Sequence, residues 1–402
     1  MTRTHITGSF QLMKSLNRSV ILTIIREYGP ISRADIAKQT KLTPPTVTNI
    51  VSELLESGIV KESAIGKSKG GRKPILLTIE AKHSYIIGID VGGRSIRAVL
   101  TDLDATIEHQ VTHALPKGMN EQTFLKVLKE VITDVLSHSS CPEEKIIGIG
   151  VGMHGIVDHT NGIALYAPNF NLANIPIKQE LEGHFEITTY VENDARALAL
   201  GESWFGNGKD IDHVLCMNVG TGIGAGIILN NELFYGHYGT AGEIGHTVVD
   251  MYGKRCQCGS YGCLQTIASS EALQQRALEA LESGRTSILM KNNLSGKVIH
   301  ECAMAGDELA IELLEETGTY LGIGIINSIH FMNPEKVIIG GGVSKAGDFI
   351  LEPLKKVVQT KALTEQARNT EIVLSHLGDN GTVIGAVTIV LKQIFSRNSA
   401  VS

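Results

Sequence analysis

The chain is poor in cysteine: six occur in 402 residues, and three of them lie within the eight positions from Cys256 to Cys263. So few cysteines in so long a chain do not form a disulfide framework, and they fit a reducing compartment and a metal site better. The sequence also lacks any run of about 18 apolar residues, which excludes a transmembrane helix. Its first residues lack the charged-then-apolar pattern of a signal peptide. We therefore expect a cytoplasmic protein with no membrane partner.

The composition is typical of a turn-rich α/β protein, with 43% hydrophobic residues and 43 glycines. A chain of this length can form two or three domains, each with its own core. The net charge of −6 conceals an asymmetry. Residues 1–82 carry 13 Lys and Arg against six Asp and Glu, whereas the remainder carries 23 against 36. A basic segment on an acidic body indicates a polyanionic partner for the first segment only.

Three helix patterns follow one another within the first 82 residues. Apolar residues recur at helical spacing over residues 11–28. A short second helix is expected to begin at a capping box formed by Ser32 and Asp35. A third begins where Thr43 can cap a helix whose first residue is Pro44.

The third helix and the residues after it indicate contact with nucleic acid. One face of that helix carries short, mostly polar side chains, and two strands at 59–62 and 75–79 flank the basic tip G-K-S-K-G-G-R-K-P. The combination resembles a winged helix-turn-helix; the alternative is a small helical domain followed by a basic linker. The candidate DNA contacts are Arg33, Pro45, Thr46, Thr48, Asn49, Ser52, Lys67, Lys69, Arg72 and Lys73.

The body of the chain contains two similar units about 130 residues apart. In the first, the apolar strand Y-I-I-G-I-D ends at Asp90 and the turn V-G-G-R-S leads into another strand. In the second, residues 214–219, 220–224 and 225–229 repeat this order. A dinucleotide-binding fingerprint needs a helix after the glycine turn, so that interpretation fails here. Two such units indicate two lobes that close on a nucleotide, a plan that resembles the actin-like sugar kinases.

Two further turns are candidates for the same cleft. Asp194 stands between a short strand and a helix predicted for 195–201; it is either an ordinary helix cap or a base that takes a proton from a sugar hydroxyl. A strand at 336–339 leads into G-G-G-V-S, which permits close packing against a flat ring such as adenine or forms only a tight turn. The last helix, 382–395, is expected to pack back onto the first lobe.

The stretch from Val219 to Cys263 joins a glycine turn, V-G-T-G-I-G-A-G-I, to G-E-I-G-H and C-Q-C-G-S-Y-G-C. One histidine and three cysteines thus occur at metal-ligand spacing; the alternative is a reduced cluster without a ligand. Together these motifs resemble the signature of the ROK family (repressors, open reading frames and kinases), from about residue 86 to the C-terminus. The N-terminal winged helix resembles the extension of its repressor branch, of the xylose-repressor and N-acetylglucosamine-repressor types.

The resemblance implies a winged helix-turn-helix domain over 1–82, followed by a two-lobed actin-like (ribonuclease H-like) sugar-kinase fold. The first lobe would span 83–196, joined by the C-terminal helix 382–402, and the second 197–381. A structural Zn²⁺ would be held by His246, Cys256, Cys258 and Cys263. Sugar contacts would be Asn169, Asn193, Asp194, Glu243, His246 and Gln265. A nucleotide would lie against Asp90, Gly92, Gly93, Thr221, Gly222, Gly224, Gly341 and Gly342, with Asp194 as the general base in the kinase branch.

Two positions depart from the kinase pattern of the family. Arg94 stands where the first phosphate loop usually has threonine, and Gln265 stands where a glutamate usually follows the last zinc cysteine. The second change replaces a charged acceptor for a sugar hydroxyl, typically contributing about 1.5–3 kcal/mol, with a neutral one contributing about 1 kcal/mol.

We therefore expect a sugar-responsive transcriptional repressor of carbohydrate uptake or catabolism genes rather than an enzyme. A homodimer, or a dimer of dimers, would bind an inverted-repeat operator in double-stranded DNA. A sugar would close the lobes and change the spacing of the two DNA-binding domains. The alternatives are an ATP-dependent sugar kinase with an appended DNA-binding domain and a regulator controlled by a protein partner.

Overall fold

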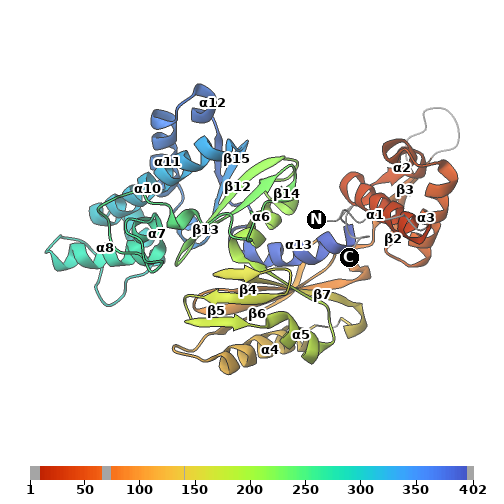
Figure 1. The fold of residues 1–402 in the computed structure, drawn as a ribbon, viewed down its shortest axis with the longest axis horizontal. Coiled ribbons are helices and arrows are strands. Elements are labelled where there is room, and N and C mark those ends of the chain that lie inside the picture. Colours follow the sequence, from red (N-terminus) through yellow and green to blue (C-terminus); the bar gives the residue numbers. More distant parts are fainter. Residues whose placement is uncertain (1–9, 66–73, 140, 396–402) are drawn as a thin grey trace.

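The computed structural model describes residues 10–65, 74–139 and 141–395. Figure 1 shows a small N-terminal head and two larger lobes, with helices lying between the lobes. None of the described helices is long and apolar enough to cross a membrane.

The head is a winged helix-turn-helix, as predicted. Its elements are α1 (Phe10–Tyr28), β1 (Ile31–Ser32), α2 (Arg33–Thr40), α3 (Pro44–Glu56), β2 (Val60–Ile65) and β3 (Ile75–Ile79). The three strands form an antiparallel sheet in the order β1-β3-β2. The Ser32 side chain accepts from the backbone N–H of Asp35 at 3.2 Å, and Thr43 caps α3 in the same way through Thr46. The local capping residues therefore set where α2 and α3 begin.

The first lobe contains a mixed five-stranded sheet in the order β11-β7-β4-β5-β6. Its elements are η1 (Ala81–His83), β4 (Tyr85–Val91), β5 (Ser95–Thr101), β6 (Ile107–Ala114), α4 (Glu121–Ser137), η2 (Glu143–Lys145), β7 (Ile146–Met153), α5 (Ile177–Phe185) and β11 (Thr189–Asn193). A second small sheet, β10-β9-β8, lies within this lobe and consists of β8 (Ile156–Asp158), β9 (Ile163–Ala167) and β10 (Leu172–Ile175). Strands β4, β5 and β6 are antiparallel neighbours, whereas β7 and β11 run parallel to β4.

The second lobe repeats this topology in the order β14-β13-β12-β15-β16. Its strands are β12 (His213–Val219), β13 (Ile223–Leu229), β14 (Glu232–Leu233), β15 (Lys336–Gly340) and β16 (Glu371–Leu374). Its helices are η3 (Ile244–His246), α7 (Gln265–Ala268), α8 (Ser270–Glu282), α9 (Gly296–Met304), α10 (Glu308–Met332), η4 (Gly342–Ala346), α11 (Asp348–Lys361), α12 (Glu365–Arg368) and η5 (Gly378–Asn380). Again three antiparallel strands are extended by two parallel ones. The prediction of two similar actin-like lobes is confirmed.

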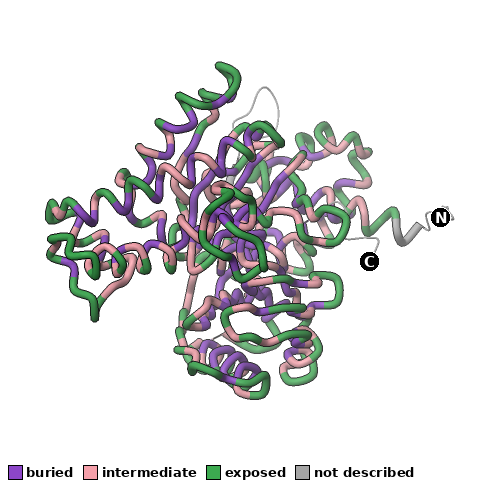
Figure 2. Tube along the Cα trace, turned by 60° about the vertical axis from the view of Figure 1, so that its left-hand side comes forward, coloured by how far each residue is buried: buried purple, intermediate pink, exposed green. Residues whose placement is uncertain are grey.

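Helices α6 (Asp194–Phe205) and α13 (Gly381–Phe395) pack against each other between the two sheets. Glycine allows this close approach, because a Cβ at Gly150 in β7 would lie 1.9 Å from the carbonyl oxygen of Ala386 in α13. Likewise, a Cβ at Gly385 would lie 1.8 Å from the carbonyl oxygen of Ala197 in α6. Most residues of both helices are buried, and Figure 2 shows buried segments gathered in the interior of the molecule. The last helix thus packs on the first lobe, as expected.

The head shares a hydrophobic core with α13. Side chains of α1, α2 and α3 form one buried cluster with residues of β4 and β5 and with Val387, Leu391 and Phe395 of α13. The hydroxyl of Thr23 in α1 donates to the backbone carbonyl of Phe395. The Arg26 guanidinium lies 3.6 Å from the centre of the Trp204 ring at the end of α6. The head is therefore packed against the ends of the two helices that separate the lobes.

Candidate functional site

A cavity of about 350 Å³ lies between the lobes, where the two sheets, α6 and the glycine turns meet. All fourteen residues predicted for sugar or nucleotide line it: Asp90, Gly92, Gly93, Asn169, Asn193, Asp194, Thr221, Gly222, Gly224, Glu243, His246, Gln265, Gly341 and Gly342. Residues far apart in sequence are brought together because most of them lie at or just after strand ends that meet between the lobes, such as the ends of β4, β11, β12 and β15, while Glu243, His246 and Gln265 come from η3 and α7. The cavity wall is rich in carboxylates, amides and exposed backbone, which suits a ligand with many hydroxyl groups.

The carboxylate of Asp194 lies at the N-terminus of α6, but the cap of this helix is its neighbour. Asn193 Oδ1 accepts from the N–H groups of Ala195 and Arg196 at 3.0 and 3.1 Å, and its Nδ2 donates to the carbonyl of Gly155 at 2.9 Å. Asp194 accepts from Ala195 N–H at 2.9 Å and from Asn218 Nδ2 at 3.2 Å. The fold therefore uses most of the Asn193 amide, which retains one N–H for a ligand, whereas Asp194 keeps free acceptor positions.

Three carboxyl groups in the cavity, those of Asp90, Asp194 and Glu243, have raised pKa values, each mainly because of burial. Burial, followed by the negative charge of Asp194, raises the pKa of Asp90 to about 7. Burial raises the pKa of Asp194 to about 6, against the lowering effect of its hydrogen bond from Ala195. A carboxyl group with a pKa near 6 is suited to accept a proton from a hydroxyl at neutral pH.

Asn169 and Thr221 meet across the cleft. Asn169 follows β9 of the first lobe, Thr221 lies in the glycine turn between β12 and β13, and the amide Nδ2 donates to the hydroxyl at 3.4 Å. This contact brings a proposed sugar-binding side chain from one lobe against a phosphate-loop side chain of the other.

Arg196 also lines the cavity, and the sequence analysis did not identify it. It is 4% exposed, and its Nε lies 2.8 Å from the carboxylate of Glu192, which is 2% exposed. Its guanidinium also donates to the carbonyl of Gly239 in the loop that leads to Glu243. The charged residue within the otherwise apolar run A-R-A-L-A-L-G, with a glutamate four residues before it, was the pattern that could have revealed this pair.

His154 is a second cavity residue that the sequence analysis did not single out. It is 7% exposed, its Nδ1 lies 3.1 Å from the carbonyl of Val91, and its ring makes an edge contact with Phe170. Within the described residues Nε2 has no hydrogen-bond partner. Burial lowers the pKa of His154, so the ring is neutral and Nδ1 carries the proton toward the carbonyl.

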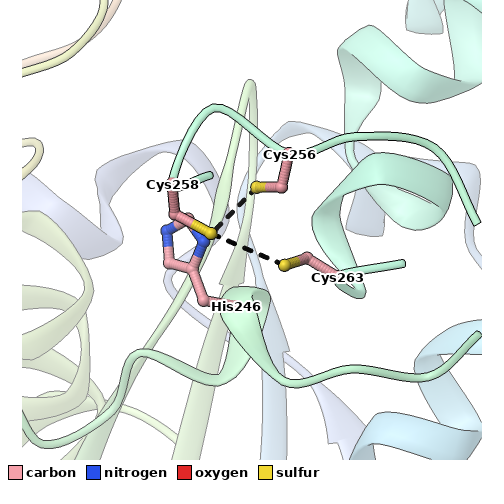
Figure 3. Close-up of side chains that lie close together, drawn as sticks. All are labelled: His246, Cys256, Cys258 and Cys263. Atoms are coloured by element: carbon pink, nitrogen blue, oxygen red, sulfur yellow. Dashed lines mark hydrogen bonds between the residues drawn. The ribbon is translucent and has the colours of Figure 1, made fainter. Parts of the chain in front are cut away.

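The four predicted metal ligands form one cluster (Figure 3). Their ligand atoms lie within 4.8 Å of one another, with Cys258 Sγ 3.7 Å from Cys263 Sγ and Cys256 Sγ 3.6 Å from His246 Nδ1. Zn–S bonds of about 2.3 Å in a tetrahedron require sulfur atoms about 3.8 Å apart. Three thiols and one imidazole at these separations fit a four-coordinate zinc ion. Of the other cysteines, which match no motif, Cys216 is buried, and Cys141 and Cys302 are partly exposed.

Gln265 lies between the metal cluster and the cavity. Its Nε2 donates to Cys256 Sγ at 3.4 Å. A glutamate, the family's usual residue at this position, has no hydrogen to donate when ionised. The amide therefore makes a contact with a candidate metal ligand that a carboxylate would not make.

The candidate DNA-binding face is presented by α3. Pro45, Thr48 and Asn49 are exposed, while Thr46 and Ser52 are partly buried. The Thr46 hydroxyl lies 2.9 Å from that of the capping Thr43. Of the predicted basic contacts, Arg33 lies 3.8 Å from the carboxylate of Glu62, and Lys67, Lys69, Arg72 and Lys73 fall outside the described residues.

Comparison with known proteins agrees with this architecture. The ROK family model matches residues 86–393, and a model of winged helix-turn-helix DNA-binding domains matches residues 17–61. A putative xylose repressor of Caldicellulosiruptor sp. (strain Rt8B.4) is 35% identical over 393 residues, which are 97% of this chain and 98% of that protein.

Solved structures of a regulator and of a kinase are also similar. A ROK family transcriptional regulator, described as a homologue of the E. coli MLC protein, has a TM-score of 0.84 at 27% identity, covering 96% of this chain and 98% of that one. A ROK family glucokinase from Streptomyces griseus, in complex with glucose and AMPPNP, has a TM-score of 0.70 at 30% identity, covering 76% of this chain and 99% of that one.

Proposed function

The chain belongs to the ROK family, and on that premise we propose that it is a sugar-responsive transcriptional repressor of carbohydrate uptake or catabolism genes. One observation carries the proposal: helix α6 begins at the cleft, with Asp194, and ends against the DNA-binding head, with Trp204. A helix of 12 residues is about 18 Å long, so a single rigid element spans the distance between the two candidate sites.

The cleft is proposed as the sugar site. Asp194 and Glu243 supply carboxylates that accept from paired hydroxyls, while Asn169 and one N–H of Asn193 supply amide groups. His246 and Gln265 lie at the same wall and would complete the contacts. A site that leaves buried polar groups unpaired with the wrong epimer rejects that epimer.

The head is proposed to bind operator DNA through the exposed face of α3. Thr48 and Asn49 would reach base edges in the major groove, and basic residues of the wing would contact phosphates. We propose a homodimer, or a dimer of dimers, on an inverted repeat, because each head presents one recognition helix and would read one half-site. Cytoplasmic location follows from this function, and all six cysteines are free.

Coupling between the sites would use α6 and α13. A sugar that contacts Asp194 and Glu243 draws together the two lobes that lie on either side of α6. The far ends of α6 and α13 carry the head through Trp204 and Phe395, so lobe closure would change the position of the head. For this to change DNA affinity, the sugar must bind one lobe arrangement more tightly than the other.

A zinc ion is proposed at His246, Cys256, Cys258 and Cys263. With four protein ligands the metal would be structural and would supply no open coordination position for chemistry. The protein residues would then fix η3, and through it the position of Glu243. Replacing Cys258 with Ser is expected to lower zinc content and sugar affinity together; sugar binding that survives complete metal loss would contradict this role.

The central experiment measures binding of the intact protein to its own upstream region and to random DNA over a series of salt concentrations, with and without sugar. The panel contains D-xylose, D-glucose and N-acetyl-D-glucosamine. We expect salt-sensitive preference for the upstream region and a change in that preference with one of the sugars. Equal affinity for both DNAs at every salt concentration would refute the repressor proposal. Preference for the upstream region that no sugar changes would favour control by a protein partner.

A second candidate, an ATP-dependent sugar kinase with an appended DNA-binding domain, is favoured by one observation. The pKa of Asp194, about 6, suits a general base, and three glycine turns line the same cavity. Arg94 opposes it, since a long cation replaces the small hydroxyl of the first phosphate loop. A coupled assay for ADP release with the same sugars tests it. Turnover that Asp194→Asn abolishes would establish a kinase.

A further inference from the structure

The loop between β14 and η3, residues 235–242, carries few bonds of its own. Its ends are fixed to β13: Phe234 N–H donates to Ile227 at 2.8 Å, and Ala225 N–H donates to Gly242 at 2.8 Å. Between these anchors there is one internal backbone bond, from Ala241 N–H to the Tyr235 carbonyl at 3.0 Å. Gly236, Gly239 and Gly242 all have positive φ angles, so this backbone has little intrinsic preference for one conformation.

Within the described part of the chain, the buried side chains of Arg196 and Glu192 contact the loop. Arg196 donates to the Gly239 carbonyl, and the buried Glu192 carboxylate lies close enough to Tyr235 that its charge, after burial, raises the pKa of the Tyr235 hydroxyl. Arg196 and Glu192 are themselves an ion pair at 2.8 Å, and Glu192 also accepts from Asn193 N–H at 2.8 Å. The guanidinium carbon lies 5.5 Å from the centre of the Tyr235 ring. The loop of one lobe is thus bound to a strand and a helix that begin in the other.

The ring of Tyr235 makes a second contact between the lobes. His159, in the turn between β8 and β9 of the first lobe, stacks on the Tyr235 ring with centroids 4.1 Å apart and planes 14° apart. The loop leads directly into Glu243 and, three residues later, His246. Any change in the loop therefore moves a proposed sugar ligand and a proposed metal ligand.

We propose that Arg196 is a positioning residue for the ligand cleft: it binds the 235–242 loop to α6 and so fixes Glu243 opposite Asp194. The effect of Arg196 on ligand binding rests on the proposed sugar site, whereas its role in holding the loop does not. Arg196 is also a buried cation of the cleft wall near both carboxylates, and its charge favours their ionised, hydroxyl-accepting forms. Because the loop is attached to α6, contact with Glu243 acts on the same helix that ends at the head.

The test compares Arg196→Met with Arg276→Met in the full-length protein. Arg276 is a matched control: it is a mostly buried arginine in α8 that bonds a carboxylate (Glu316) and a hydroxyl (Thr317), but it does not line the cleft. Hydrogen–deuterium exchange of peptides covering 235–242 is measured without ligand. Calorimetry with D-xylose, D-glucose and N-acetyl-D-glucosamine gives sugar affinity, and thermal unfolding gives stability.

We expect Arg196→Met to speed exchange in the loop and to weaken binding of the recognised sugar by about tenfold or more. Arg276→Met should lower thermal stability while leaving both loop exchange and sugar affinity within about twofold, less than the tenfold that corresponds to 1.4 kcal/mol. Arg196→Lys should restore part of the protection, because one ammonium can bond Glu192 or Gly239 but does not reproduce the guanidinium fork.

A variant that fails to fold does not block the test. Arg196→Met leaves Glu192 buried and uncompensated, so the double variant Glu192→Gln/Arg196→Met removes that charge while still lacking the bond to the loop. Unchanged loop exchange in the double variant would overturn the proposal. If no sugar binds the wild type, the proposed control by a sugar is contradicted, but the exchange measurement still decides whether Arg196 holds the loop.

Discussion

The contact between Arg26 and Trp204 provides a direct test of how the head is attached to the body. The guanidinium carbon lies 3.6, 5.5 and 5.7 Å from the centres of the Trp204, Phe205 and Phe395 rings. Burial lowers the pKa of Arg26 to about 10. A cation–π contact contributes about 0.5–1 kcal/mol when exposed and about 2 kcal/mol when desolvated. Arg26→Ala should therefore weaken docking of the head by about 1–2 kcal/mol, or about 5- to 30-fold.

Trp204 is the only tryptophan in the chain, so fluorescence excited selectively from tryptophan reports on the surroundings of this ring. Arg26→Ala is expected to shift the emission to longer wavelength and to increase quenching by acrylamide, because the ring gains contact with water. The ratio of operator affinities without and with sugar should fall toward one, while sugar affinity stays within about twofold because Arg26 lies about 18 Å from the cleft along α6.

Lys14→Ala is the matched control within the head. Lys14 forms an ion pair with Glu53 at 2.7 Å, with half of its side chain exposed, so its loss should cost about 1 kcal/mol or less. It should leave tryptophan emission and the affinity ratio unchanged. If Arg26→Ala shifts the emission but preserves the full effect of sugar on DNA binding, then α6 does not connect the two sites, and the coupling mechanism is refuted.

Three other changes have defined outcomes. Gln265→Glu replaces the donor to Cys256 Sγ with a carboxylate and should weaken zinc retention by about 10–100-fold in competition with a chelator; unchanged retention would mean that the amide does not support the thiolate. Asp90→Asn should flatten the pH dependence of stability. The Asp90 carboxyl, whose pKa is raised to about 7, keeps its proton in the folded state at pH values where the unfolded chain loses it. The free energy of unfolding of the wild type therefore falls as pH rises from about 4 to 7, by at most about 1.4 kcal/mol per pH unit. Urea unfolding at several pH values measures this, and an equal slope in the variant would contradict the assignment. Gly150→Ala places a Cβ 1.9 Å from the Ala386 carbonyl oxygen, where only backbone can yield, and should destabilise the protein by about 3 kcal/mol or more in the same assay; a change below about 0.5 kcal/mol would show that α13 is free to shift.

The features that the sequence predicted well are those determined by neighbouring residues. Ser32 and Thr43 cap their helices as expected, and the two strand–glycine–strand units form two sheets of identical topology. The fold, the head and the grouping of the fourteen cleft residues follow from such local patterns together with the family resemblance.

The features that the sequence did not reveal depend on contacts between distant segments. In the sequence, Arg196 is a single charged residue in an alanine-rich helix, and its contact with the Gly239 carbonyl exists only in the folded chain. Asn193 is predicted to bind sugar, but the sequence does not reveal that the same amide also caps α6 and bonds the Gly155 carbonyl. Gln265 is predicted to be a weakened sugar ligand, and the sequence does not reveal its bond to Cys256, because that bond depends on the position of α7 beside the cysteine loop.

The bond from Thr23 to the Phe395 carbonyl spans 372 residues and joins the first described helix to the last. The ribosome synthesises α1 long before α13, so the α13 part of the surface on which the head rests becomes available only after both lobes have been translated. We expect, accordingly, that a chain ending before α13 holds its head less firmly against the body. Only a chain that includes α13 would then regulate a promoter fully, and a bulky insertion directly after Phe395 should disturb gene control more than one in a surface loop of the second lobe.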